Sequence, residues 1–130
     1  MKFIMRGDVF LINNKRFNVY FRKAKEEFKK YERTKQIIFL AQASEKLWNA
    51  FNLLIESKLG RRIRSFKDLR NGVSELYAKT GLKLWINTFE NAYSLHKFFY
   101  RGWTDEEGEV KNLFQNTLNE IILLKKIKTR

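Results

Sequence analysis

The chain has 130 residues, carries a formal net charge of +13 and contains neither cysteine nor proline. The absence of cysteine excludes disulfides, zinc–thiolate sites and thiol nucleophiles. A composition of 44% hydrophobic residues without proline is typical of helices joined by short connections, so we expect an all-α fold. The length suits one domain over residues 1–130, and no stretch has the ~18 apolar residues of a membrane-spanning helix. These features fit a cytoplasmic protein with no membrane partner.

Positive charge is concentrated in the N-terminal third of the chain. Residues 1–36 hold eleven Lys and Arg against four Asp and Glu, whereas residues 82–130 hold eight against six. Such an excess suggests a polyanionic partner, and nucleic acid before a membrane surface. The alternative is that the charge only keeps the chain soluble.

Residues 1–12 are interpreted as an N-terminal arm, followed by a helical bundle over residues 13–128. The arm could be a short strand, an irregular segment or the lead-in to a helix. Asn13 or Asn14 is a plausible N-cap for the first helix, which has apolar residues at helical spacing on one face. Basic residues occupy much of its remaining surface. If that surface faces phosphates, its candidate contacts are Arg22, Lys29 and Lys30. Otherwise it is an ordinary solvated face of an amphipathic helix.

The stretch from Thr34 to Gly60 predicts a long helix around which the others are arranged. At 1.5 Å per residue this helix would be ~35–40 Å long. Gly60 ends it where a left-handed residue is usual. Its apolar residues recur at steps of three and four, which indicates a helix and excludes a strand: Ile37, Leu40, Ala41, Leu47, Trp48, Phe51, Leu54 and Ile55.

The segment that follows Gly60 is the densest basic cluster. Arginines on a short loop can reach one phosphate backbone together, so this loop is the best candidate for a nucleic-acid contact. The alternative is a solvated loop whose arginines favour the dipole of the preceding helix. The candidate contacts are Arg61, Arg62 and Arg64, with Lys58 and Lys67 on either side.

Three further helices are predicted after this loop. Ser65 and Asp68 form a capping-box-like start for the third helix, Gly81 ends it, and the fourth spans about residues 82–100. Thr104 begins the fifth with a capping box, and Trp103 is expected to plug one end of the bundle. Together the segments predict an up-and-down bundle of four to five helices. The face expected to be buried in the third helix comprises Phe66, Leu69, Val73, Leu76 and Tyr77.

No complete catalytic or metal-binding motif occurs in the sequence. The carboxylates of residues 105–107 are explained by helix capping, and no glycine pattern of a nucleotide-binding loop is present. We therefore expect no metal and no cofactor. The single histidine, His96, lies beside Leu95 and Phe99 at helical spacing. A hydrogen-bonded packing role for it is favoured over catalysis.

Several segments taken together resemble a known superfamily. They are FRKAKEEFKK at residues 21–30, QASEKLWNAF at residues 42–51 and LHKFFYR at residues 95–101, followed by a long amphipathic helix. In this order they are similar to the HEPN domain (higher eukaryote and prokaryote nucleotide-binding), and especially to an uncharacterised archaeal repeat-protein branch. The likeness covers about residues 17–127.

The resemblance implies a helical bundle that forms a homodimer. In active HEPN domains it implies metal-independent RNA cleavage by an Arg and a His that lie four to six residues apart. No Arg stands at that spacing before His96, and Arg70-Asn71 resembles the start of the motif, with Glu75 where the His is expected. Cleavage would have to use His96 with Arg101 or with an arginine of a partner chain. The family also implies a nucleotidyltransferase partner in a toxin–antitoxin pair.

Three functions are consistent with these observations. The first is a non-enzymatic basic module that binds RNA or other nucleic acid. The second is a metal-independent endoribonuclease that acts at a dimer interface. The third is a structural or partner-binding module in which the charge confers solubility alone.

Overall fold

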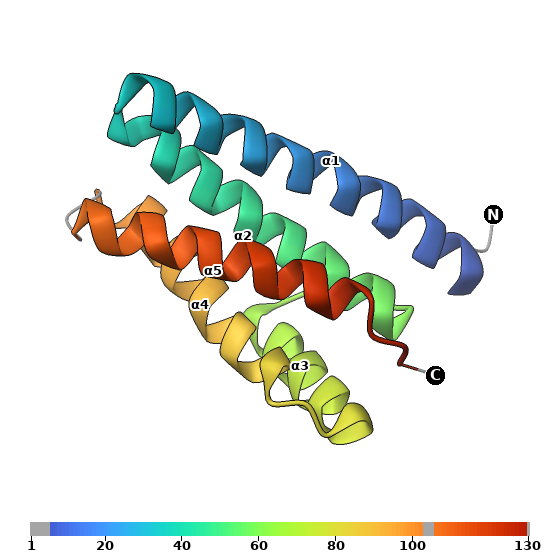
Figure 1. Cartoon of the computed structure of the whole chain (residues 1–130). Helices are drawn as coiled ribbons and strands as arrows, with labels where there is room; N and C mark the ends of the chain where they lie inside the picture. Colours follow the sequence, from blue (N-terminus) through green and yellow to red (C-terminus); the bar gives the residue numbers. More distant parts are fainter. Residues whose placement is uncertain (1–5, 103–105, 130) are drawn as a thin grey trace.

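The computed structural model describes the backbone of residues 6–102 and 106–129, and the side chains of residues 14–102 and 106–129. These residues form five helices and no strand, which confirms the predicted all-α bundle (Figure 1). The helices are α1 (Arg6–Thr34), α2 (Ile37–Leu59), α3 (Phe66–Thr80), α4 (Leu84–Tyr100) and α5 (Glu107–Lys125).

Within the described residues, the segment interpreted as an N-terminal arm is the first part of a helix, which agrees with the lead-in to a helix among the alternatives for it. Helix α1 begins at Arg6, so residues 6–12 are helical and neither Asn13 nor Asn14 is an N-cap. Residues 1–5 of the predicted arm lie outside the described residues. Extending an existing helix adds one hydrogen bond for each residue fixed, whereas starting a new one carries the cost of a nucleus. With no proline before Thr34, the helix therefore continues toward the N-terminus past the asparagines.

A tight turn joins α1 to α2. Lys35 has a positive φ of 59°, and its N–H donates to the Tyr31 carbonyl at 2.7 Å. The Thr34 hydroxyl donates to the Lys30 carbonyl and accepts from the backbone N–H of Gln36. The left-handed position that glycine usually fills at a helix end is thus occupied by a lysine. As a result α1 and α2 form an antiparallel pair along their length (Figure 1).

Helix α2 is the centre of the core, as the periodicity predicts. Leu40, Leu47 and Phe51 are fully buried in it. Helices α4 and α5 pack on the side of α2 that α1 leaves open, and the rings of Phe28 in α1 and Phe114 in α5 stack with centroids 4.4 Å apart. One continuous hydrophobic cluster therefore joins all five helices.

The predicted ends of α2 and α3 are confirmed. Gly60 and Gly81 adopt left-handed conformations with φ of 70° and 71°, and the Ser65 hydroxyl accepts from the backbone N–H of Asp68. Gly72 permits a close approach, because a Cβ there would lie 2.7 Å from Leu59 Cδ1.

Two expectations about the later helices are not met. Phe66, predicted to be buried, is 43% exposed, because it occupies the first position of α3 at the edge of the bundle. Helix α5 begins at Glu107, with Glu106 in the N-cap position and no side-chain hydrogen bond there. The predicted cap at Thr104 and plug at Trp103 lie outside the described residues.

Candidate nucleic-acid interface

The loop at residues 61–65 is held in place by its backbone. The Ile63 N–H donates to Glu56 Oε1 at 2.9 Å, and the Arg64 N–H donates to Asp68 Oδ2 at 3.1 Å. Carboxylates from the helices on either side thus fix the path of the chain. The arginines that flank Ile63 are therefore presented from a fixed support.

The three loop arginines differ in their surroundings. Arg61 Nη2 is paired with Glu75 Oε2 at 2.8 Å, and Glu75 is also contacted by Lys79 at 3.5 Å. The hydrogen bond from Arg61 is the main cause that lowers the pKa of Glu75 below its ordinary value, and Lys79 adds to it against the opposing effect of burial. By contrast, Arg62 and Arg64 are exposed and have no ion pair within the described residues.

Of the two lysines predicted beside the loop, one is already engaged. The Lys58 ammonium donates to the carbonyls of Lys125 and Ile127 at 2.8 and 2.6 Å, and so caps the end of α5. Burial, and then repulsion from Lys125, lower its pKa. Lys67 is exposed on the first turn of α3 and has no ion pair in the described part of the chain. Lys58 therefore serves the fold, whereas Lys67 is accessible.

The predicted basic residues of α1 are partly balanced by its own carboxylates. Arg22 lies 3.6 Å from Glu26, and Lys30 lies 3.7 Å from Glu27, while Lys29 is exposed. Such surface pairs are worth little energetically, but they reduce the local excess of positive charge. This face is less clearly cationic than the sequence alone suggests.

An aromatic surface lies next to the loop, on α3 and α4. The Phe66 ring is 4.8 Å from that of Tyr93, centroid to centroid, and Tyr100 is 70% exposed one helical turn beyond His96. Cations lie over two of these rings: Arg70 over Phe66 at 6.0 Å and Lys97 over Tyr93 at 4.8 Å. An accessible ring beside a cation is the arrangement on which unpaired bases stack in single-stranded nucleic-acid sites.

One side of α2 carries a half-buried polar stripe. Its members recur at alternating steps of three and four, the spacing that places residues on one helix face. We call it the α2 polar stripe: Gln42, Glu45, Asn49, Asn52 and Glu56. Since this spacing repeats over the length of the helix, the stripe connects the neighbourhood of His96 to that of the loop.

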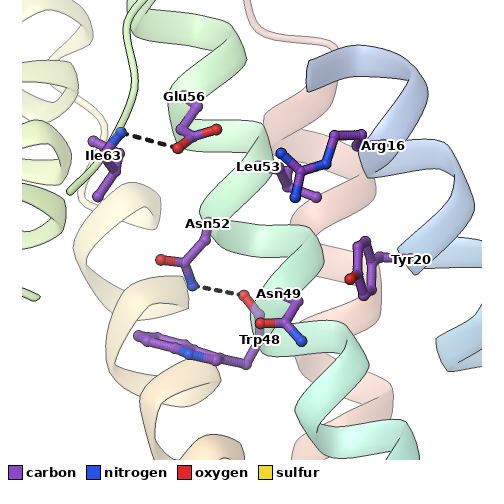
Figure 2. Close-up of a pocket in the computed structure, with 8 residues that line it drawn as sticks. All are labelled: Arg16, Tyr20, Trp48, Asn49, Asn52, Leu53, Glu56 and Ile63. Atoms are coloured by element: carbon purple, nitrogen blue, oxygen red, sulfur yellow. Dashed lines mark hydrogen bonds between the residues drawn. The ribbon is translucent and has the colours of Figure 1, made fainter. Parts of the chain in front are cut away.

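A pocket of about 270 Å³ lies at the loop end of this stripe. Figure 2 shows its lining drawn from α1, from α2 and from the loop. The Asn52 side-chain amide donates to the Trp48 carbonyl at 2.8 Å, and Glu56 accepts from Ile63 as described above. The lining residues are Arg16, Tyr20, Trp48, Asn49, Asn52, Leu53, Glu56 and Ile63.

His96 lies farther along the stripe, in α4. Its Nδ1 is 2.9 Å from Glu45 Oε1, its ring stacks on Trp48 at 4.9 Å, and the side chain remains 28% exposed. The ring is thus hydrogen-bonded and packed, and it also reaches the surface. Arg101 is exposed just after α4, and no hydrogen bond or ion pair joins it to His96 within the described residues.

The described residues hold neither a metal-binding cluster nor a membrane-spanning helix. No three His, Asp or Glu side chains there are grouped so that they could hold a metal ion. None of the described helices is both long and apolar enough to cross a membrane.

A comparison with known protein families identifies the family of this chain. The model of the archaeal PaREP1/PaREP8 family matches residues 15–113. The chain belongs to this family. The match confirms the archaeal repeat-protein part of the resemblance, and it spans α2, α3, α4 and the loop between α2 and α3. No curated protein and no solved structure is significantly similar to this PaREP1/PaREP8 chain.

The sequence pointed to the loop but missed the pocket beside it. Arg16, Tyr20 and the two asparagines of α2 are ordinary polar residues of amphipathic helices, with no motif to mark them. The spacing of the α2 polar stripe was a usable signal, because polar residues at steps of three and four within an otherwise buried helix indicate a second interface. That they face Arg16 depends on how α1 pairs with α2.

Proposed function

We propose that this PaREP1/PaREP8 protein binds single-stranded RNA, or other single-stranded nucleic acid, through the surface formed by the loop, the start of α3 and the α2 polar stripe. The observation that carries the proposal is the fixed loop with Arg62 and Arg64 exposed and unpaired in the described residues. Lys67 and Arg70 extend the same basic surface along α3. Binding by phosphate contacts releases counterions, so the affinity depends on salt.

The aromatic surface supports a single-stranded ligand over a duplex. Phe66 and Tyr100 expose ring surface, and bases can reach such rings only when they are unstacked. Stacking on each ring is worth ~1–3 kcal/mol and tolerates any base. The proposal follows the HEPN-like resemblance in its ligand class, but a homodimer and a nucleotidyltransferase partner stay predictions.

The experiment is fluorescence anisotropy with a labelled single-stranded RNA at two salt concentrations. We expect the affinity to fall by ~10-fold or more between about 50 and 200 mM salt. The double variant Arg62→Glu/Arg64→Glu should weaken binding by ~10-fold or more at the lower salt, because two favourable phosphate contacts become repulsive.

A charge-matched control keeps this test specific. Lys29→Glu/Arg33→Glu makes the same change in net charge near the other end of the α1–α2 pair. It should weaken binding much less than the loop variant. Equal losses in the two variants would mean that net charge alone drives association, and a salt-independent affinity would also contradict the proposal.

A second candidate function is RNA cleavage with His96 as general acid or base. The observation that favours it is the contact of Glu45 with Nδ1, because a carboxylate there orients the imidazole, and Nε2 has no hydrogen-bond partner among the described residues. If it operates, His96→Ala abolishes cleavage of single-stranded RNA and Glu45→Gln reduces it. Cleavage by the His96→Ala variant would show that His96 is not the general acid or base.

A further inference from the structure

The pocket at the end of the α2 polar stripe has a defined hydrogen-bonding character. Asn52 Nδ2 donates a hydrogen bond to the Trp48 carbonyl, which can only accept. The orientation of the amide is therefore fixed, and Asn52 Oδ1 remains as an acceptor.

Glu56 is a second acceptor in the same wall of the pocket. Its Oε1 is bound by the Ile63 N–H, which fixes the carboxylate against the loop. Figure 2 shows the other oxygen on the side away from Ile63. An ionised carboxylate cannot donate a hydrogen bond, so a ligand that contacts this wall must bring N–H or O–H groups.

The opposite wall, formed by α1, supplies donors. The Arg16 guanidinium extends from α1 toward α2, and Tyr20 lies one helical turn farther along α1 (Figure 2). Asn49 lies between the walls and can donate through its amide. The pocket therefore combines two acceptors on α2 with a strong donor on α1.

The size of the pocket suits one small heterocycle. A volume of about 270 Å³ lies just below the ~300–1,000 Å³ that ligand pockets span. Trp48, Leu53 and Ile63 add apolar atoms to the lining. Ile63 of the lining lies between Arg62 and Arg64 in the loop, and both arginines are exposed, so a nucleotide bound in the pocket would have its sugar–phosphate backbone near this basic segment.

Among the RNA bases, guanine fits this pattern best. Its Watson–Crick edge carries two adjacent N–H donors, at N1 and N2, and an acceptor at O6. Adenine and cytosine each offer only one amino donor beside ring acceptors, and uracil offers one N–H between two carbonyls. Only guanine places two donors against the Asn52 and Glu56 wall and an acceptor toward a donor such as Arg16 or Asn49.

We propose that this pocket binds an unstacked guanine of the single-stranded RNA, with Glu56 and Asn52 accepting from the N1 and N2 groups. The inference rests on the proposed function, to which it adds base selectivity. Phosphate contacts at the loop supply affinity without sequence preference, and the pocket supplies the preference.

The test compares short uridine oligonucleotides that carry a single central guanine, adenine or inosine. By anisotropy, guanine should bind ~10-fold more tightly than adenine, the range expected of a good two-point base contact. Inosine lacks only the N2 amino group and should fall between the two. The preference for guanine should persist as added salt lowers the affinity for all three oligonucleotides, because contacts to the base release no counterions.

Glu56→Gln is the decisive variant. Its carbonyl oxygen can still accept from Ile63, while the amide places a donor where the free carboxylate oxygen stood. We expect the guanine preference to disappear and the affinity for plain oligouridine to be kept, which also shows that the variant folds. Asn52→Ala should reduce the preference independently, and Glu26→Gln, with the same charge change on the exposed surface of α1, should leave it intact.

A calorimetric titration of the protein with GMP separates this inference from the proposed function. Salt-dependent binding with equal affinity for guanine, adenine and inosine overturns the guanine pocket and leaves the nucleic-acid surface standing. Binding of GMP that Glu56→Gln abolishes, without affinity for any oligonucleotide, keeps the pocket and overturns the nucleic-acid surface. Absence of both overturns both.

Discussion

The two faces of α2 follow the same helical spacing but have different fates. One face, which includes Leu47, Phe51 and Ile55, is fully buried beneath the other helices. The other is the α2 polar stripe, which is only half-buried and borders the pocket. Burial of the first face supplies stability. The second face is left partly uncovered, so its polar atoms are available to a ligand.

Position in the bundle, and not residue type alone, decides whether a polar group holds the fold together or is accessible to a ligand. Lys58 and Lys67 both belong to the basic cluster of the sequence, yet one caps α5 and the other is solvated. Arg61 and Arg62 are adjacent, yet within the described part of the chain only Arg61 is paired with a carboxylate. Paired groups contribute to the fold, and unpaired groups can contribute to binding.

The sharpest test of the two faces is a pair of alanine variants on α2. Phe51→Ala should lower the free energy of unfolding by ~3–5 kcal/mol, because it removes a fully buried ring and leaves a cavity. Asn49→Ala should change it by less than ~0.5 kcal/mol, because the Asn49 side chain is half-buried and makes no hydrogen bond to the described residues. Urea denaturation measures both. Similar losses for the two variants would break the distinction between the faces.

A pair of lysine variants tests the same distinction at the end of α2. Lys58→Met should cost about 1–2 kcal/mol of stability, because two carbonyls at the end of α5 lose a charged donor. Lys67→Met should be close to neutral in stability and should instead weaken RNA binding. Denaturation and anisotropy on both proteins give four values. A stable Lys58→Met variant with weakened RNA binding would reverse the assignment.

Two glycine variants test whether the turn before the loop is specifically constrained. Gly60→Ala should lose about 1 kcal/mol, because alanine is strained at a φ of 70°. Gly108→Ala should gain about 0.5–1 kcal/mol, because Gly108 lies in α5 with open space where a Cβ would stand. Thermal unfolding of the two proteins should show midpoint shifts of opposite sign, and a shared sign would contradict this account of the turn.

The smallest expected effect concerns the pairing of Glu75 with Arg61 and its dependence on pH. Since the folded state lowers the pKa of Glu75, the unfolded chain binds its proton at a higher pH. The stabilisation is therefore present above the ordinary carboxyl pKa and is lost as pH falls through the lowered value. For an exposed pair it amounts to ~0.2–1 kcal/mol.

Glu75→Gln should therefore flatten the loss of stability in acid, and Arg61→Gln should flatten it similarly because it removes the main cause of the shift. Urea midpoints measured from neutral pH to about pH 3 give the comparison. An unchanged acid slope in Glu75→Gln would show that the pair contributes nothing to folding.

The helical class, the central position of α2 and the helix ends at Gly60, Ser65 and Gly81 could all be predicted from the sequence, because they depend on local periodicity and capping. The basic loop could also be located, because charge density is a property of composition. The start of α1 was predicted wrongly, since helix propagation past Asn13 and Asn14 overrides a local capping preference.

Which of these polar side chains are accessible to a ligand depends on the tertiary structure. The carbonyls that Lys58 caps lie 67 and 69 residues farther along the chain, and the carboxylate beside His96 lies 51 residues earlier. The pocket requires Arg16 of α1 to stand opposite Glu56 of α2. Such pairings depend on how the helices pack. They cannot be predicted from helical periodicity, because the paired residues lie far apart in the sequence.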